Sequence, residues 1–188
     1  MNDQQQIDEI FQRIAGDLSM IADRKLEIRP AVVQRASVRV AATTGVHISF
    51  KLGFQHAGRI LHGALLVPLP DAQALASYLM MLPEENVPAK RAQTTLDGVT
   101  KEALLELGNF VGGAADAALH GLGLDPIRVR SESCQGVKPG VRPAFVHAEG
   151  EPLVVGRAQA QLGPWPACEW ILQLPELAPQ ALSSGAAA

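Results

Sequence analysis

The stretch from 103 to 121, ALLELGNFVGGAADAALHG, constrains the fold more than any other part of the chain. An α-helix turns by about 100° per residue, so residues three or four apart share a face. On that spacing one face is apolar and carries Leu104, Leu107, Val111, Ala114, Ala115 and Ala118. We expect this helix to begin near Thr100 and to bury this face in the core.

The opposite face of the same helix carries a narrow polar strip. Its residues fall within an arc of roughly 80° at helical spacing, and they are Glu102, Glu106, Asn109, Gly113, Asp116 and His120. Glycine costs about 1 kcal/mol relative to alanine in a helix interior, so solvent exposure alone does not favour it. Either the strip is simply solvated, with Gly112 and Gly113 letting another element pack closely, or the missing side chains let another surface approach Asn109.

Glu106 and Asn109 are the residues of this strip with the clearest chemistry. They lie three positions apart, so their side chains are neighbours on one turn. The carboxylate can pair with a lysine, and the amide can both donate and accept hydrogen bonds. An amide is well suited to orienting a water molecule for attack on phosphorus.

The rest of the chain alternates between helical and strand patterns. Apolar residues at helical spacing predict a helix over 4–23, and a proline start predicts another over 70–82. Residues 83–93 form either a polar connection or a short helix interrupted at Pro88. Segments rich in Val, Ile and Leu predict strands over 37–54, 59–69, 126–133, 142–150, 151–162 and 168–174. The pattern predicts an α+β fold in which an antiparallel sheet is backed by long helices.

The first helix repeats a pattern of the long one. Both contain E-x-x-amide-x-x-x-G before a run of strands, as Glu9, Gln12 and Gly16 and as Glu106, Asn109 and Gly113. The repeat indicates either a pseudo-duplicated helix–strands unit or the chance recurrence of a short pattern.

Gln12 is one methylene longer than asparagine, and an error of about 1 Å in reach can cost about a hundredfold in rate. We therefore expect Glu9 and Gln12 to form a degenerate, mainly structural second site. Phe11 and Ile14 of the same helix would then belong to the core.

Composition excludes several classes of function. The 188 residues suit a single domain over 1–176 and a low-complexity tail over 177–188. A net charge of −3 without a basic run argues against a nucleic-acid surface. No apolar stretch approaches the roughly 20 residues that span a bilayer, and no signal peptide is recognisable, so we expect a cytoplasmic protein without membrane contact. The scattered histidines and two isolated cysteines predict no metal site.

The E-x-x-N-x-x-x-G helix in LLELGNFVGGAADAAL resembles the signature of the CheC/CheX chemotaxis phosphatase family, whose relatives include flagellar switch proteins. The preceding segment 58–80 is similar to the corresponding part of that family. The resemblance covers residues 5 to 175, and the long helix is its one specific motif. It implies a phosphatase that acts on the aspartyl phosphate of a CheY-type response regulator in chemotaxis or two-component signalling.

The resemblance also implies roles for individual residues. Asn109 would enter the regulator's active site and hold a water in line with phosphorus, and Glu106 would pair with a lysine of the regulator. The predicted partner contacts are Glu102, Gly112, Gly113 and Asp116. The protein would need no cofactor of its own, because the phosphorylated receiver domain supplies Mg²⁺. A homodimer through a sheet edge is compatible with the family.

Two positions depart from the family pattern. Glu102 stands four residues before Glu106, where the family has Asp or Ser, and Glu132 stands twenty-three residues after Asn109, where the pattern tends to have Pro. Both bear on partner docking. They favour the alternative of a non-catalytic receiver-binding adaptor related to flagellar switch subunits. A small-ligand sensor is a third hypothesis, and segment 131–143 is either a loop that sets partner choice or a connection between strands.

Overall fold

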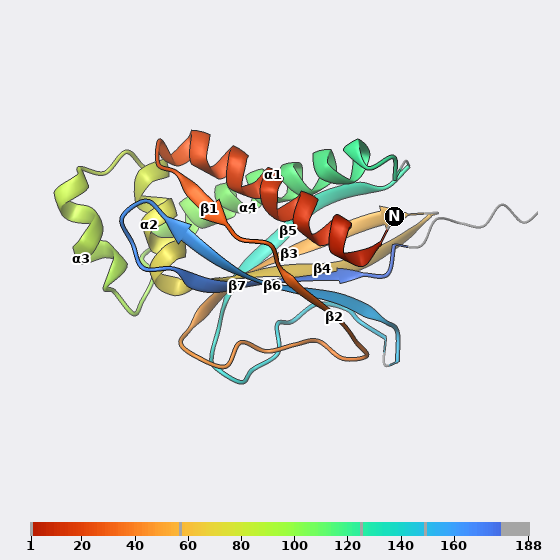
Figure 1. The fold of residues 1–188 in the computed structure, drawn as a ribbon. Coiled ribbons are helices and arrows are strands. Elements are labelled where there is room, and N and C mark those ends of the chain that lie inside the picture. Colours follow the sequence, from red (N-terminus) through yellow and green to blue (C-terminus); the bar gives the residue numbers. More distant parts are fainter. Residues whose placement is uncertain (1, 57, 125, 149, 178–188) are drawn as a thin grey trace, which may run out of the picture.

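The computed structural model describes residues 2–56, 58–124, 126–148 and 150–177. Within these residues four α-helices pack on a seven-stranded antiparallel sheet, which confirms the predicted α+β class (Figure 1). The helices are α1 (Asp3–Ala22), α2 (Leu69–Leu79), α3 (Val87–Arg91) and α4 (Gly98–Gly121), with a 3₁₀ turn η1 (Glu84–Asn86) before α3. The strands are β1 (Leu26–Ile28), β2 (Val32–Ala36), β3 (His47–His56), β4 (Arg59–Pro68), β5 (Arg128–Val137), β6 (Leu153–Leu162) and β7 (Cys168–Pro175).

The sheet has the order β1-β6-β7-β4-β3-β5, and β2 also pairs with β6. Two hairpins, β3–β4 and β6–β7, meet at its centre where β4 pairs with β7. The long helices α1 and α4 lie side by side across one face of this sheet (Figure 1).

The topology supports the predicted pseudo-duplication. One unit runs α1, β1/β2, β3 and β4, and the other runs α4, β5, β6 and β7. In each unit the helix is followed by an edge strand that pairs with the hairpin of the other unit. Thus β1 and β2 pair with β6, while β5 pairs with β3. This exchange of edge strands ties the two halves into one sheet.

The main core lies between the helices and the sheet. All six residues of the predicted apolar face of α4 are buried, as are Phe11 and Ile14 of α1. Trp170 of β7 is fully buried, and its indole nitrogen donates to the buried carboxylate of Asp71 at 3.2 Å. Burial of apolar area at about 25 cal/mol per Å² makes this layer the principal stabilising contact of the fold.

A second, smaller core lies on the outer face of the sheet, and it corrects two predicted strands. The strand predicted over 37–54 begins only at His47, as β3, and residues 142–148 form no strand. Residues 37–46 and 142–148 are irregular segments that pack on this face. Phe145 packs there against the sheet. The backbone of Val40 is bonded by the side chain of Gln173, which accepts from its nitrogen at 2.7 Å and donates to its oxygen at 2.9 Å. Ala42 and Phe145 are buried on the sheet and Val40 is partly buried there, whereas Val38, Val46 and Val146 are exposed. The apolar residues of these segments therefore did not indicate strands.

Two further segments differ from the sequence predictions. Strands β1 and β2 were not predicted, because they are short and flank Pro30. Segment 131–143 is not a single loop, since its first half continues β5 to Val137. The predicted tail lies outside the described residues, apart from Leu177 at its start.

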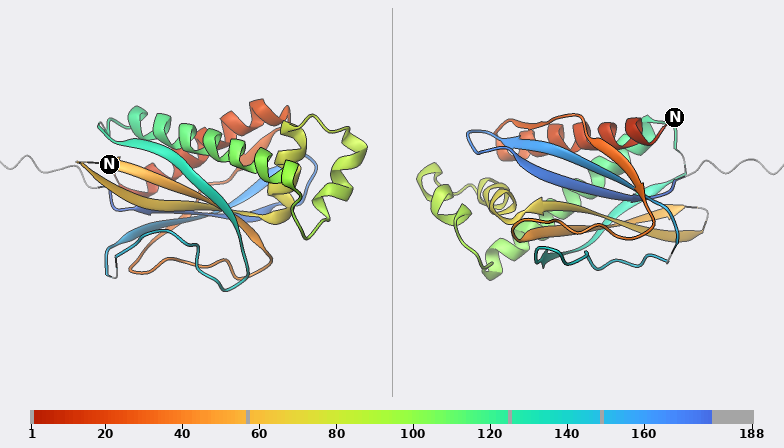
Figure 2. Two further views of the ribbon diagram at one scale, coloured as in Figure 1. Left: turned by 180° about the vertical axis from the view of Figure 1, so that it is seen from behind. Right: turned by 60° about the horizontal axis from the view of Figure 1, so that its bottom comes forward.

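Glycines on α4 bring this helix unusually close to β5, which runs beside it (Figure 2). A Cβ atom on Gly112 would lie 2.7 Å from the backbone nitrogen of Ser131, and one on Gly108 would lie 2.7 Å from its Oγ. A Cβ on Gly113 would meet nothing within 4 Å. Gly112 is therefore required by packing against backbone, Gly108 lies against a Ser131 hydroxyl that can rotate, and Gly113 is not required.

This difference predicts opposite effects of two adjacent substitutions. Gly113→Ala should raise the stability by about 1 kcal/mol through helix propensity, or about 2–4 °C in Tm. Gly112→Ala should lower the Tm, because its Cβ pushes α4 away from β5 at a cost of about 1–3 kcal/mol. Thermal unfolding followed by circular dichroism measures both. A Gly112→Ala variant as stable as Gly113→Ala would contradict the close contact.

Candidate functional site

The polar strip of α4 is exposed where the sequence predicts it to be. Glu102, Glu106, Asn109 and Gly113 all face solvent. The side-chain nitrogen of Asn109 donates to Oε2 of Glu106 at 3.3 Å, so the predicted pair lies together on one turn. The apolar face of the helix is buried beneath it, and this fixes the direction in which the pair points.

A shallow depression lies beside this pair, between α4 and β5. It has a volume of about 420 Å³ and is lined by Asn109, Gly113 and Asp116 of the helix and by residues 128–131 of the strand. The open space above Gly113 arises because no side chain covers the helix backbone there. An incoming group can therefore reach Asn109 from the strand side.

The strand side of the depression was not predicted as part of the site. The sequence R-V-R-S at 128–131 does carry a signal, because alternate residues of a strand point to opposite faces. Val129 is buried against the core, whereas Arg128 and Arg130 are exposed. Two arginines thus stand near an acidic helix strip.

Two of the predicted partner contacts have internal roles. Gly112 is buried against β5 and offers no surface to a partner, which corrects its predicted role. Asp116 is half-buried, and its Oδ1 accepts from the backbone nitrogen of Val129 at 2.6 Å. This bond holds the start of β5 against α4, so Asp116 shapes the depression from within.

Helix α1 carries residues at the positions equivalent to those of the α4 site. Adding 97 to the numbers of Gln12 and Ser19 gives those of Asn109 and Asp116. Ser19 Oγ accepts from the backbone nitrogen of Leu26 at 2.8 Å, matching the bond made by Asp116. The two helices thus hold their edge strands in the same way.

Gln12 differs from Asn109 in what its amide does. Its Nε2 donates to the backbone oxygen of Ile28 at 2.9 Å, which joins α1 to β1. Asn109 is one methylene shorter and makes no hydrogen bond to β5 within the described residues. Glu9 is exposed, but the amide beside it is already used within the protein. The geometry favours α4 as the functional helix.

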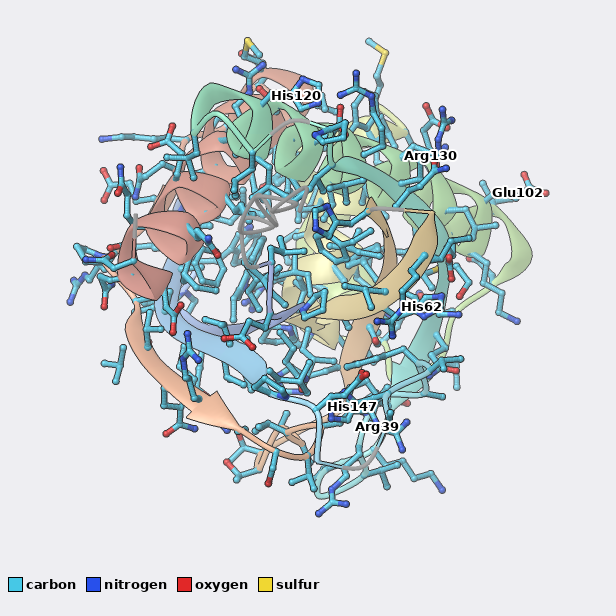
Figure 3. The ribbon with its side chains drawn as sticks, turned by 90° about the vertical axis from the view of Figure 1, so that its right-hand side faces the viewer. Arg39, His62, Glu102, His120, Arg130 and His147 are labelled. Carbon is cyan, nitrogen blue, oxygen red and sulfur yellow. The ribbon has the colours of Figure 1, made fainter. Side chains whose placement is uncertain are left out.

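Glu132 stands where the pattern of the resembled family tends to have proline, and its charge is balanced within the protein. Its carboxylate contacts Lys51 Nζ at 2.7 Å and His62 Nε2 at 3.2 Å. These partners belong to β3 and β4, and Figure 3 shows His62 apart from Glu102 and His120 of α4. The departure at position 132 therefore adds no unbalanced charge to the strip.

Metal-binding and membrane-spanning features are absent from the part of the chain that the structure describes. No group of three or more His, Cys, Asp or Glu side chains there could hold a metal ion. No helix among those residues is long and apolar enough to cross a bilayer. Burial raises the pKa of both cysteine thiols, that of Cys168 to about 11, which disfavours their reactive thiolate form.

No family model matches this sequence, and no curated protein matches it either. Solved structures do match. FliY from Thermotoga maritima is similar with a TM-score of 0.68 and 16% identity, covering 92% of this chain and 89% of that one. A CheC-like superfamily protein from Shewanella sp. PV-4 has a TM-score of 0.58 and 12% identity over 92% and 98% of the two chains. CheX from Desulfovibrio desulfuricans has a TM-score of 0.55 and 15% identity over 89% and 96%.

The chain has the fold of the CheC-like superfamily. This fold is shared by chemotaxis proteins and by flagellar switch domains, and identities of this size show the fold alone. The likeness spans nearly the whole chain, as expected from the sequence resemblance.

In this CheC-like fold the helix that carries the site is fixed at its first turn. Asp97 caps α4, and its Oδ1 accepts from the backbone nitrogen of Thr100 at 2.7 Å. A hydrogen bond from Lys90 and those from Thr100 hold the pKa of the Asp97 carboxyl well below its usual range. The charged form of Asp97 therefore stabilises the native protein.

This cap predicts a pH-dependent loss of stability. Because the folded pKa is depressed, the contribution is present above the unfolded pKa of about 3.9 and is lost as the pH falls below it. Asp97→Ala should lower the Tm at pH 7, and the gap to wild type should narrow below about pH 4. Asp97→Asn, which keeps a capping oxygen, should lower the Tm at pH 7 by less than Asp97→Ala does. A gap between wild type and Asp97→Ala that stays constant down to pH 2 would contradict this role.

Proposed function

We propose that this protein is a phosphatase for the aspartyl phosphate of a CheY-type receiver domain. The observation that carries the proposal is the exposed Glu106–Asn109 pair beside an open depression, on a helix whose other face is fixed in the core. The fold, shared with CheX and CheC-like proteins, supports it.

The proposed chemistry is catalysis by positioning. The Asn109 amide enters the receiver's active site and holds a water in line with phosphorus. The water oxygen forms a bond to phosphorus as the bond to the aspartyl oxygen breaks, leaving aspartate and inorganic phosphate that carries the water's protons. Fixing the water lowers the entropic barrier, since bound and oriented reactants reach effective molarities of about 10⁵ M or more. The receiver supplies Mg²⁺, which neutralises charge on the phosphoryl group.

Glu106 has the role of an anchor. Its carboxylate is exposed and bonded to Asn109, and an additional bond to a lysine of the receiver would fix both side chains together. Glu102 lies one turn earlier on the same strip and extends the acidic surface toward the start of α4. Gly113 lets the receiver approach the helix backbone beside Asn109.

A non-catalytic receiver-binding adaptor is the second candidate function. It is supported by the likeness to FliM of H. pylori, which matches with a TM-score of 0.66 in its complex with FliG. It would use the same strip of α4 for binding, without holding a water. Both functions predict that the protein binds a phosphorylated receiver domain, but only the phosphatase accelerates the loss of its phosphoryl group.

The phosphatase proposal predicts that Asn109→Ala lowers the dephosphorylation rate that the protein contributes by about a hundredfold, because no group then orients the water. Asn109→Gln should also be impaired, since its amide is displaced by one methylene. The measurement is the decay of radiolabelled phosphoryl groups on receiver domains from the source organism, with and without the protein.

Asn86→Ala is the matched control, because Asn86 is an exposed asparagine of η1 outside the α4–β5 depression. It should accelerate decay as wild type does. Equal decay with wild type and with Asn109→Ala would refute the catalytic role. Binding of a receiver by wild type without any acceleration would favour the adaptor.

A further inference from the structure

The charges around the α4–β5 depression are divided between its two sides. The helix side is lined by Asn109, Gly113 and the half-buried Asp116, and the strand side by Arg128 and Arg130. The exposed carboxylates of Glu102 and Glu106 lie outside this lining, on the turns of α4 before Asn109. Figure 3 shows Glu102, Arg130 and His120 on the helix side of the molecule, whereas Arg39 and His147 lie on the opposite side of the sheet. A partner that covers the depression therefore meets one acidic and one basic edge.

The two arginines are not equivalent. The guanidinium of Arg128 donates to His120 Nδ1 at 3.3 Å and to the oxygen of Ile127 at 3.4 Å, so it is held at the end of α4. Arg130 is exposed and makes no side-chain hydrogen bond or ion pair within the described residues. It lines the same depression as Asn109. Its five donors are therefore free to bind a planar carboxylate.

We propose that Arg130 is a specificity-determining residue that pairs with a carboxylate of the receiver beside its phosphorylated aspartate. This inference rests on the proposed function, because it takes the receiver as the partner. Mg²⁺ in proteins is bound by carboxylates and phosphate oxygens, so the receiver surface that meets Asn109 is acidic. Arg130 faces that acidic surface while Glu106 requires a lysine, and the two edges together fix the orientation of the receiver on α4.

Because Arg130 is exposed, we expect its substitution to act mainly on the rate at which the receiver associates. Charges at the rim of an interface act mainly on the association rate and its salt dependence, and like charges placed together are repulsive. Reversal of this charge should therefore slow association more than it changes the chemistry. For turnover it should raise KM more than it lowers kcat.

Binding to a non-hydrolysable complex tests the proposal separately from catalysis. Receiver domains of the source organism, loaded with Mg²⁺ and beryllofluoride in place of the phosphoryl group, are titrated by stopped-flow fluorescence. At about 50 mM salt, Arg130→Glu should slow association about tenfold or more, and this difference should shrink markedly at about 500 mM salt, where screening is strong. Arg130→Lys should keep most of the wild-type rate, because the positive charge remains.

Arg29→Glu is the matched control, because it makes the same charge change at an exposed arginine outside the α4–β5 depression. It should associate within about twofold of wild type. Wild-type association by Arg130→Glu at low salt, or an equal loss with Arg29→Glu, would overturn the proposal. If the protein binds the receiver but does not accelerate dephosphorylation, the phosphatase function is refuted, while the association rates still decide the role of Arg130. If the protein binds no receiver, both proposals are overturned.

Discussion

The close approach of α4 to β5 is the contact on which the rest of this structure depends. It requires a residue without a Cβ at position 112, because the Ser131 backbone occupies the space that a side chain at 112 would take. The contact turns the opposite side of the helix outward, with Glu106 and Asn109 exposed at the edge of the depression. Helix propensity is lost at each glycine, by about 1 kcal/mol, in exchange for this geometry.

The two halves of the molecule differ by one methylene in the amide at equivalent helix positions, Gln12 and Asn109. Both long helices hold their edge strand by a side-chain oxygen at the same position, Ser19 in one and Asp116 in the other. The longer amide of Gln12 reaches the strand and bonds it, whereas the shorter amide of Asn109 stays at the surface beside an open depression. In one half the amide holds an edge strand, and in the other half it is exposed, as the proposed function requires.

The long helices could be predicted from sequence because their apolar residues recur at helical spacing on one buried face. The central strands could be predicted because they are runs rich in Val, Ile and Leu. The outer segments could not, since Val40 is bonded by the side chain of Gln173 and not by a neighbouring strand. The exposed pair on α4 followed from helical geometry. The separate roles of Gly112 and Gly113 did not, because only the position of β5 distinguishes a packed glycine from an open one. Arg130 was missed for the same reason, as its place beside Asn109 depends on tertiary contact.

The central claim is that the Asn109 amide works inside the partner's active site. A crystal structure of this protein with a beryllofluoride-loaded receiver domain and Mg²⁺ tests it most directly. The account predicts that α4 covers the receiver's active site, with the Asn109 amide within about 3 Å of a fluoride or of a water that bonds it. A complex in which α4 lies away from that site, with Asn109 still in solvent, would contradict the account.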